Sequence, residues 1–286
     1  PRSVVRHQSA FQNLKQVFAG KRLADISPFL IERYKRLRKE EGRSGATINR
    51  ELAFLKNLFT MAIAWGKTCE NPVKQVRLFR EDNGRMRFLT EEEEARLFAA
   101  CSPSLQPVVL TALHTGFRKS ELLSLTWQDV DFQRRMITVQ AAYAKNGETR
   151  SVPMTATVTA TLRALQSTAV STEAVFLTHR GAPYRNFRKV FIDTCRRAAV
   201  TDMTFHDLRH TFASRLVMAG VDLPTVKELL GHKSIAMTMR YAHLSHGHKQ
   251  SAIAMLDQRG EKVPTIFTTG RKAGDRTSLQ VLERHG

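Results

Sequence analysis

The first third of the chain alternates apolar and polar residues with the period of an α-helix. A helix start is predicted at Ser27-Pro28, because Ser caps a helix N-terminus and Pro fits its first turn. A second helix is predicted from Gly45 to Trp65. The apolar faces of these two helices are Leu30, Tyr34 and Leu37 in the first, and Ile48, Leu52, Leu55 and Phe59 in the second. We therefore expect a helical domain over residues 1–80.

A capping box at Thr90 and Glu93 follows a polar run and predicts the start of a second domain. We place a linker at 81–88, this domain at 89–258 and a polar C-terminal tail at 259–286. The helices of the 89–258 domain are predicted at 91–101, 104–115, 118–125, 186–199, 206–219, 222–230 and 234–243. Short strands are predicted at Met136–Val139, Ser151-Val152 and Ala174–Thr178, with an Asn146-Gly147 hairpin turn joining the first two. The expected fold class is mainly α with a small β-sheet, an α+β arrangement.

The net charge of the chain indicates what kind of partner it binds. The 286 residues contain 45 Lys and Arg against 26 Asp and Glu, a formal charge of +19. Residues 1–85 hold 18 basic and 8 acidic side chains, a net +10, which indicates a polyanionic partner such as double-stranded DNA. Arg50 and Asn57 lie opposite the apolar face of their helix, and Arg43 extends that side. These three are the candidate DNA-binding residues, with a merely solvated basic face as the alternative.

Other classes are excluded by what the sequence lacks. No segment approaches the ~20 apolar residues that span a bilayer, and no secretory signal is visible, so we expect a cytoplasmic, DNA-associated protein without a membrane partner. Cys69, Cys101 and Cys195 are far apart, which excludes a disulfide framework or a cysteine zinc site.

The residues with chemical potential stand where helices start or turns tighten. They are Arg118 after Thr115-Gly116, Lys145 beside the Asn-Gly turn, His206, Arg209 and His210 on one helical face, His232 after Leu230-Gly231, and Tyr241. Arginine forks match phosphate oxygens and stay charged. A Tyr phenol ionises near pH ~10, so its attack at neutral pH needs a base or nearby positive charge. The set predicts phosphodiester chemistry with Tyr241 as nucleophile.

Each member has a simpler alternative when taken alone. Arg118 could pair with Glu121, and Lys145 could be a solvated hairpin lysine projecting from a tight tip. His206 and His210 at i and i+4 could bind zinc, but Arg209 between them makes a dication unfavourable.

The order and spacing of these residues resemble the tyrosine recombinase, or phage integrase, family. The resemblance covers about 86–258, and the N-terminal helices look like the family's core-binding domain. It implies that Tyr241 attacks DNA to form a 3′-phosphotyrosyl bond. Arg118 and Arg209 would grip the phosphate, His232 would hydrogen-bond it, Lys145 would be the general acid and His206 the base or proton relay. Glu121 would hold the Arg118 region, and His210 would serve orientation or packing.

The resemblance also implies assembly and biology. Family members are site-specific recombinases of phages and other mobile elements, acting in DNA integration and recombination as tetramers on paired sites, sometimes with accessory directionality or bending proteins. They need no cofactor, neither ATP nor a metal. Residues 246–258 would pack on a neighbouring subunit or form an ordinary terminal helix. The alternatives are a type IB topoisomerase, a non-catalytic DNA-binding protein on the same fold, and a zinc hydrolase.

Overall fold

The computed structural model describes residues 2–81, 86–143, 147–168, 173–184 and 186–244. The chain forms two compact units, residues 1–85 and 86–286, so the division falls within the predicted 81–88 linker. The predicted terminal segment 246–258 and tail 259–286 lie outside the described residues. Within the described part of the chain, none of the helices combines the length and apolar character that crossing a membrane requires.

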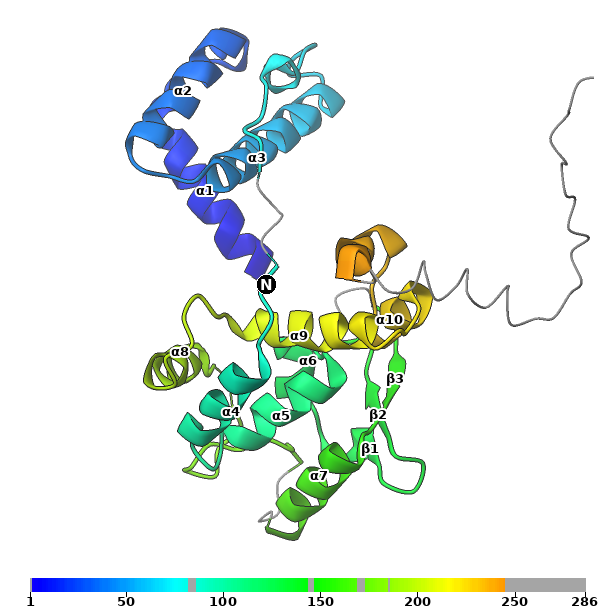
Figure 1. The fold of residues 1–286 in the computed structure, drawn as a ribbon. Helices are drawn as coiled ribbons and strands as arrows, with labels where there is room; N and C mark the ends of the chain where they lie inside the picture. Colours follow the sequence, from blue (N-terminus) through cyan, green and yellow to red (C-terminus); the bar gives the residue numbers. More distant parts are fainter. Residues whose placement is uncertain (1, 82–85, 144–146, 169–172, 185, 245–286) are drawn as a thin grey trace, which may run out of the picture. The chain divides into compact units, whose positions relative to one another are not determined.

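The N-terminal unit consists of helices, drawn in blue to cyan in Figure 1. They are α1 (Arg2–Phe18), η1 (Leu23–Asp25), α2 (Pro28–Glu40), α3 (Gly45–Ala64) and η2 (Pro72–Gln75). The predicted cap of α2 is confirmed, because the Ser27 hydroxyl accepts a hydrogen bond from the Leu30 N–H at 3.3 Å. Both α1 and α2 pack against α3, which is the central helix of this unit.

The predicted apolar face of α3 is confirmed as the core of this unit. Its four predicted positions are 0–3% exposed: Ile48, Leu52, Leu55 and Phe59. The predicted face of α2 is only partly right, since Tyr34 is buried but Leu37 is 40% exposed. Instead of Leu37, the next residue Arg38 turns inward, because a buried carboxylate on α3 binds it.

That carboxylate belongs to Glu51, which ties three helices together. It accepts hydrogen bonds from Asn13 of α1 at 2.7 Å, from the Tyr34 hydroxyl at 2.7 Å and from Arg38 Nη2 at 2.7 Å. Burial alone would raise the pKa of Glu51, but these hydrogen bonds outweigh it and the pKa is lowered. The glutamate is therefore ionised and fully bonded inside the unit.

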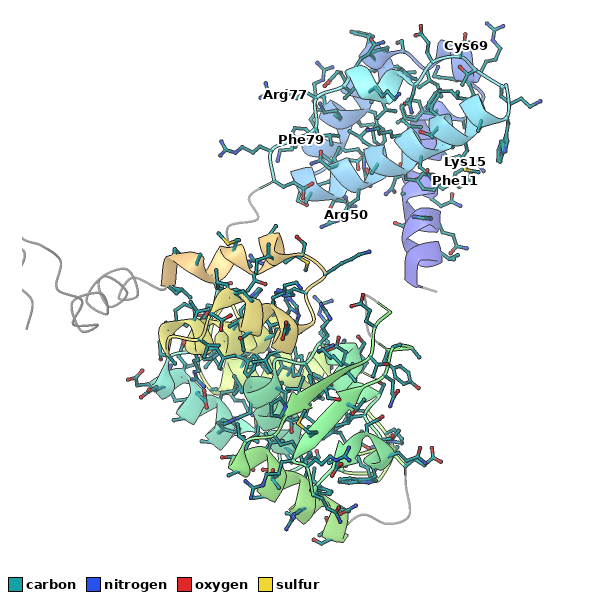
Figure 2. The ribbon with its side chains drawn as sticks, turned by 90° about the vertical axis from the view of Figure 1, so that its right-hand side faces the viewer. Phe11, Lys15, Arg50, Cys69, Arg77 and Phe79 are labelled. Atoms are coloured by element: carbon teal, nitrogen blue, oxygen red, sulfur yellow. The ribbon has the colours of Figure 1, made fainter. Side chains whose placement is uncertain are left out.

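The chain that leaves η2 folds back onto the start of α3. The Asn49 side chain donates to the Phe79 carbonyl and accepts from the Phe79 N–H, each at 2.9 Å. The Lys35 ammonium lies 5.0 Å from the centre of the Phe79 ring. Figure 2 shows Phe79 at this end of α3, with Arg50 on the same helix.

The C-terminal unit is a helical body with a small sheet at one side (Figure 1). Its helices are α4 (Glu91–Ala100), α5 (Gln106–Thr115), α6 (Lys119–Leu123), α7 (Ala156–Thr168), α8 (Arg188–Arg197), α9 (Phe205–Met218) and α10 (Leu223–Leu230), with 3-10 turns η3 (Trp127–Asp129), η4 (Ile235–Met237) and η5 (Met239–Leu244). The sheet is antiparallel in the order β1 (Val130–Asp131), β2 (Met136–Val139), β3 (Arg150–Pro153). The predicted fold class, mainly α with a small sheet, is confirmed, as is the capping box at Thr90 and Glu93.

Pairing of β2 with β3 ends at Val139 and Arg150. Asn146 of the predicted Asn146-Gly147 turn lies outside the described residues, so that turn stays a prediction. Other local predictions in this unit differ from the structure. The predicted strand Ala174–Thr178 forms only isolated bridges, because its pairing partners are single residues of loops. Helix α7 carries no prediction at all.

The predicted helix 234–243 is instead two short 3-10 helices. Backbone bonds reach back three residues, as from the Thr238 N–H to the Ile235 carbonyl at 2.8 Å and from the Tyr241 N–H to the Thr238 carbonyl at 2.9 Å. Thr238 is completely buried and its hydroxyl is bonded to His232, which fixes this tighter winding.

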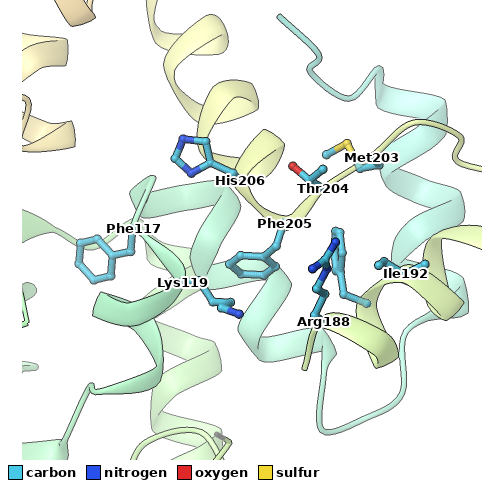
Figure 3. Close-up of a pocket in the computed structure, with 9 residues that line it drawn as sticks. Phe117, Lys119, Arg188, Ile192, Met203, Thr204, Phe205 and His206 are labelled. Carbon is cyan, nitrogen blue, oxygen red and sulfur yellow. The ribbon is translucent and has the colours of Figure 1, made fainter. Parts of the chain in front are cut away.

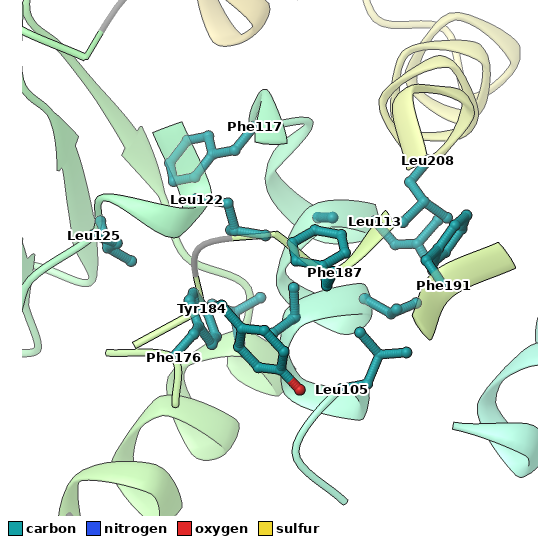
Figure 4. Packing of buried hydrophobic residues seen from close by; sticks show 14 of the residues in the cluster. Leu105, Leu113, Phe117, Leu122, Leu125, Phe176, Tyr184, Phe187, Phe191 and Leu208 are labelled. Carbon is teal, nitrogen blue, oxygen red and sulfur yellow. The ribbon is translucent and has the colours of Figure 1, made fainter. Parts of the chain in front are cut away.

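Helix α9 lies between two groups of buried side chains. Leu208 belongs to the large core, which includes Phe117, Leu122 and Phe187 and is drawn in Figure 4. Further along α9, Ala213 and Val217 belong to a smaller cluster with the buried residues Val226, Leu230 and Tyr241. Because α9 packs against α5, α10 and η5, side chains from its first turns meet residues of all three.

Candidate active site

Arg118 stands just after a helix end that only glycine can form. Gly116 ends α5 with a φ of +63°, and a Cβ there would clash with Phe212 and Leu230. The chain then turns into α6, whose first peptide N–H group, that of Arg118, bonds Glu121 at 2.9 Å. The Thr115-Gly116-x-Arg118 segment therefore places Arg118 between the end of α5 and the start of α6.

The Arg118 guanidinium is held by two elements. Its Nη1 donates to Glu121 at 2.7 Å and its Nη2 donates to the Gly231 carbonyl at 3.1 Å. The Glu121 side chain is fully buried, whereas the Arg118 side chain is 15% exposed. The predicted contact between these residues is present, and it leaves one side of the guanidinium accessible.

Arg150 is a member of this cluster that the sequence analysis missed. Its Nη2 lies 2.6 Å from Glu121 and its Nε donates to the Leu229 carbonyl at 3.3 Å. Its guanidinium also lies 5.5 Å from the centre of the Phe117 ring. The available signal was strand alternation, since Arg150 shares the inward face of β3 with the buried Val152.

Glu121 stays ionised between these two arginines. Burial would raise its pKa, but the hydrogen bond and charge of Arg150, followed by the bonds from Arg118, lower it. The carboxylate thus fixes the direction of Arg118, and because Arg150 is bound to it as well, the cluster carries one more positive than negative charge.

Arg209 is buried in α9 and points at two helix ends. Its Nη1 donates to the Gly116 carbonyl at 2.7 Å and its Nη2 to the Leu230 carbonyl at 2.6 Å. These carbonyls end α5 and α10, where the helix dipoles are negative. Burial, and then the charge of Arg118, lower the pKa of Arg209 to about 9, which still leaves it protonated at neutral pH.

His232 follows the turn that both arginines contact. Its Nδ1 lies 2.8 Å from the Thr238 hydroxyl, and the side chain is buried. Burial, and then the charges of Arg209 and Arg118, lower the pKa of His232 to about 3. It is therefore a neutral hydrogen-bonding group beside two cations.

Tyr241 reaches the same region from η5. The side chain is 1% exposed, and its hydroxyl lies 2.5 Å from His210 Nδ1. Burial raises the pKa of Tyr241, while the charges of Arg209 and Arg240 oppose that rise. Among the described residues, this hydroxyl is hydrogen-bonded to His210, which the family resemblance assigned to orientation or packing.

His206 lies one helical turn before His210 on α9. The two imidazole rings are edge to face, with centroids 5.0 Å apart. Burial, and then the charge of Arg209, lower the pKa of His206. His206 also lines a cavity of about 310 Å³ with Phe117, Lys119 and Arg188, shown in Figure 3.

The remaining predicted site residues lie elsewhere. Lys145 lies outside the described residues, so its role as general acid stays a prediction. Arg43, Arg50 and Asn57 are exposed in the N-terminal unit. Arg50, labelled on α3 in Figure 2, and Asn57 line a surface hollow of about 580 Å³ between α1 and α3, which Arg43 does not line.

The described part of the chain contains no cluster of side chains that would support the zinc alternative. Groups of at least three His, Cys, Asp or Glu side chains suited to a metal ion are absent there. His210 Nδ1 is bonded to the Tyr241 hydroxyl, and the Arg209 guanidinium is on the same helix.

The mainly helical fold and a buried tyrosine among arginines and histidines define the class of protein. Residues 87–248 match the model of the phage integrase family, and the chain belongs to this family. The expectation drawn from the motif order is thereby confirmed.

Particular relatives support this assignment. The integrase of Salmonella phage P22 is 31% identical over 242 residues, which cover 80% of this chain and 62% of that integrase. The tyrosine recombinase XerC of Roseiflexus castenholzii is 31% identical over 240 residues, 78% of this chain and 74% of the recombinase.

Solved structures share the fold. The Tn1549 transposon integrase in complex with a circular intermediate DNA superposes with a TM-score of 0.76 at 21% identity, over 91% of this chain and 94% of that one. A lambda integrase tetramer bound to a Holliday junction gives a TM-score of 0.73 at 21% identity, over 84% of this chain and 71% of that one.

Proposed function

We propose that this chain is a site-specific DNA recombinase that cuts and rejoins DNA through a 3′-phosphotyrosyl intermediate. The main evidence is that two arginines and a histidine meet at one turn, residues 230–232. Arg209 binds the Leu230 carbonyl, Arg118 binds the Gly231 carbonyl, and His232 is the next residue. Tyr241 enters this cationic group from η5, close enough for Arg209 to act on its pKa.

This arrangement suits attack on a phosphodiester. Arg118 and Arg209 bind the non-bridging oxygens of the scissile phosphate, where negative charge grows in the transition state. His232, neutral because of its lowered pKa, donates a hydrogen bond to the same phosphate. The Tyr241 oxygen bonds to phosphorus as the bond from phosphorus to the 5′-oxygen breaks, and Lys145 supplies a proton to that leaving oxygen.

Rejoining reverses these steps. A 5′-hydroxyl of a partner duplex attacks the phosphotyrosine, a new phosphodiester forms and Tyr241 leaves. One phosphodiester is exchanged for another through a phosphotyrosine, so the bond energy is conserved and no ATP is consumed.

The DNA partner follows from charge and from relatives. The N-terminal unit carries 18 basic against 8 acidic side chains, a net +10, and Arg43, Arg50 and Asn57 are exposed on it. The similar integrase structures contain DNA, and one is a tetramer on a Holliday junction. We assign this chain a homotetramer on paired sites, with accessory bending or directionality proteins as further partners.

The decisive experiment traps the covalent intermediate. On a suicide DNA substrate that carries a nick, the wild-type protein should become joined to the 3′ side of the cut. Tyr241→Phe removes the attacking oxygen but keeps the ring, so DNA binding should survive while the covalent product vanishes. Tyr143→Phe is the matched control, because Tyr143 is 52% exposed and should leave the product unchanged.

The outcomes separate the alternatives. A covalent product from Tyr241→Phe would move the nucleophile to another tyrosine, with Tyr184 and Tyr143 next to be tested. Relaxation of supercoiled DNA without any joining of two sites would support the type IB topoisomerase. Binding of DNA without a covalent product from the wild type would support the non-catalytic protein.

A further inference from the structure

The hydrogen bond between His210 and Tyr241 goes beyond the roles that the family resemblance supplies. It joins His210 Nδ1 on α9 to the Tyr241 hydroxyl on η5 at 2.5 Å, and both side chains are buried. A phenol is a far stronger acid than a neutral imidazole N–H, and an imidazole nitrogen is the better acceptor. Tyr241 therefore donates, and Nδ1 of His210 offers a lone pair directly to its proton.

The groups around this pair are mostly cationic or neutral. The titratable and charged side chains that act on it are His206, Asp207 and Arg209 of α9 and Arg240 of η5. Asp207 is occupied in capping α9, where it accepts from the Thr204 N–H at 2.7 Å and the Thr204 hydroxyl at 2.8 Å. Burial, and then His206 and Arg240, lower the pKa of His210 to about 4, so its imidazole is neutral at neutral pH.

We propose that His210 is the catalytic base for the recombinase reaction proposed above, taking the proton of Tyr241 as the tyrosine attacks the scissile phosphate. The Tyr241 O–H bond breaks and its proton goes to His210 Nδ1. The oxygen's electron pair forms the new bond to phosphorus, and the electron pair of the broken P–O bond leaves on the 5′-oxygen. His206, whose ring centroid is 5.0 Å from that of His210, then serves as the relay that carries the proton onward.

The charge distribution couples this base to DNA binding. Arg209 is among the cations that lower the basicity of His210 in the free protein. A phosphate bound at Arg118 and Arg209 brings negative charge that opposes this effect and stabilises the imidazolium. Proton transfer is therefore favoured only once the scissile phosphate is in place, which keeps the tyrosine un-ionised in the free protein.

The test replaces the base but keeps a hydrogen-bonding group. His210→Gln can still bond the Tyr241 hydroxyl, but an amide does not take up a proton at neutral pH. Covalent complex formation in a single turnover should slow by about 10²–10⁴-fold, while DNA affinity stays within about twofold of wild type. His243→Gln is the matched control: His243 is an exposed residue of the same η5 turn, and its replacement should leave the rate unchanged.

The pH profile distinguishes a base from a packing residue. The substrate should carry sulfur in place of the bridging 5′-oxygen, because a thiolate leaves without a proton and the general acid no longer matters. The wild-type rate should then be flat between pH ~6 and pH ~9, while that of His210→Gln rises about tenfold per pH unit with the tyrosinate fraction. A wild-type rate and flat profile in His210→Gln, or recovery of its rate on the sulfur substrate, would overturn the proposal.

Failure here is separable from failure of the proposed function. No covalent product from the wild type contradicts the recombinase itself. A product that depends on Tyr241 but not on His210 contradicts only the base assignment. If His210→Gln does not fold, the wild-type profile on the sulfur substrate decides, since a tenfold rise per pH unit there would exclude a neutral base of low pKa.

Discussion

Each unit of the chain contains a buried glutamate that binds arginine side chains, and the two clusters differ in the charges that surround the arginines. In the N-terminal unit Glu51 binds Asn13, Tyr34 and Arg38, and the Arg38 side chain is only 5% exposed. Arg38 also pairs with Glu41, so its guanidinium is enclosed by the unit's own carboxylates.

In the C-terminal unit Glu121 also binds guanidinium groups, those of Arg118 and Arg150. Here the Arg118 side chain is 15% exposed, and its other partner is the Gly231 carbonyl, a neutral group. The cluster therefore keeps positive charge that is not cancelled, directed at the turn that carries Gly231 and His232.

A buried ion pair becomes a binding site when its positive charge exceeds its negative charge. Both carboxylates have lowered pKa values despite burial, so both are ionised and both fix a guanidinium. The ratio of charges differs: Arg38 faces two carboxylates, whereas Glu121 faces two arginines. An excess of arginine over carboxylate leaves a binding site for an anion such as phosphate.

The largest expected effect comes from removing either glutamate. Glu51→Ala and Glu121→Ala should each lower the free energy of unfolding of their own unit by about 3–5 kcal/mol. The first leaves the buried Tyr34 hydroxyl and Arg38 without their shared acceptor, and the second leaves the guanidiniums of Arg118 and Arg150 without a carboxylate. Trp65 and Trp127, one in each unit, allow urea unfolding to be followed separately by fluorescence in Trp65→Phe and Trp127→Phe backgrounds. A loss below about 1 kcal/mol would show that solvent reaches these pairs.

The arginines should separate the clusters by function. Arg118→Ala and Arg209→Ala should each slow cleavage of bound DNA by about 10²–10³-fold, since removing one donor to a developing oxyanion costs about 3–4 kcal/mol. Arg38→Ala should weaken folding of the N-terminal unit but leave the cleavage step of bound DNA unchanged. Single-turnover rates at saturating DNA measure this, and equal losses in all three variants would contradict the comparison.

The sequence predicts features that depend on neighbouring residues, and it fails where a contact joins residues far apart in the chain. Periodicity predicts the buried face of α3 correctly, because a helix with one core side needs an apolar residue every three or four positions. It fails at Leu37 and Arg38, because the inward turn of Arg38 depends on Glu51, thirteen residues away on another helix. Local pattern does not contain that contact.

The candidate site divides in the same way. Motif order indicates Arg118, Arg209, His232 and Tyr241. The structure brings the first three to one turn and places Tyr241 on η5 against α9. Arg150 reaches Glu121 across 29 positions of sequence, and His210 reaches Tyr241 across 31. Both partnerships are set by how β3 and η5 fold back, so only the tertiary structure identifies them.

A smaller effect is expected from pH. Both glutamates have folded-state pKa values below the usual ~4.3, so their stabilisation is present above that pH and is lost as the pH falls through the folded value. Glu51→Gln and Glu121→Gln should each flatten this acid-side loss of stability in their own unit. Urea midpoints from pH ~6 down to pH ~3 measure it, and an unchanged slope in either variant would show that the group does not titrate as described.

The smallest expected effect lies at an exposed arginine on the surface of the N-terminal unit. Arg50 is exposed and lines the hollow between α1 and α3, so its charge is available to a DNA phosphate rather than bound within the unit. Arg50→Ala should weaken DNA binding and reduce the slope of log affinity against log salt by about 0.9, the share of one phosphate contact. The weakening should be similar on specific and unrelated duplexes, and cleavage of bound DNA should keep its rate. Arg22→Ala is the matched control, because the Arg22 side chain is 85% exposed but paired with Asp25. An unchanged salt slope in Arg50→Ala would remove this residue from the DNA surface and leave the excess of positive charge on the N-terminal unit to act through other side chains.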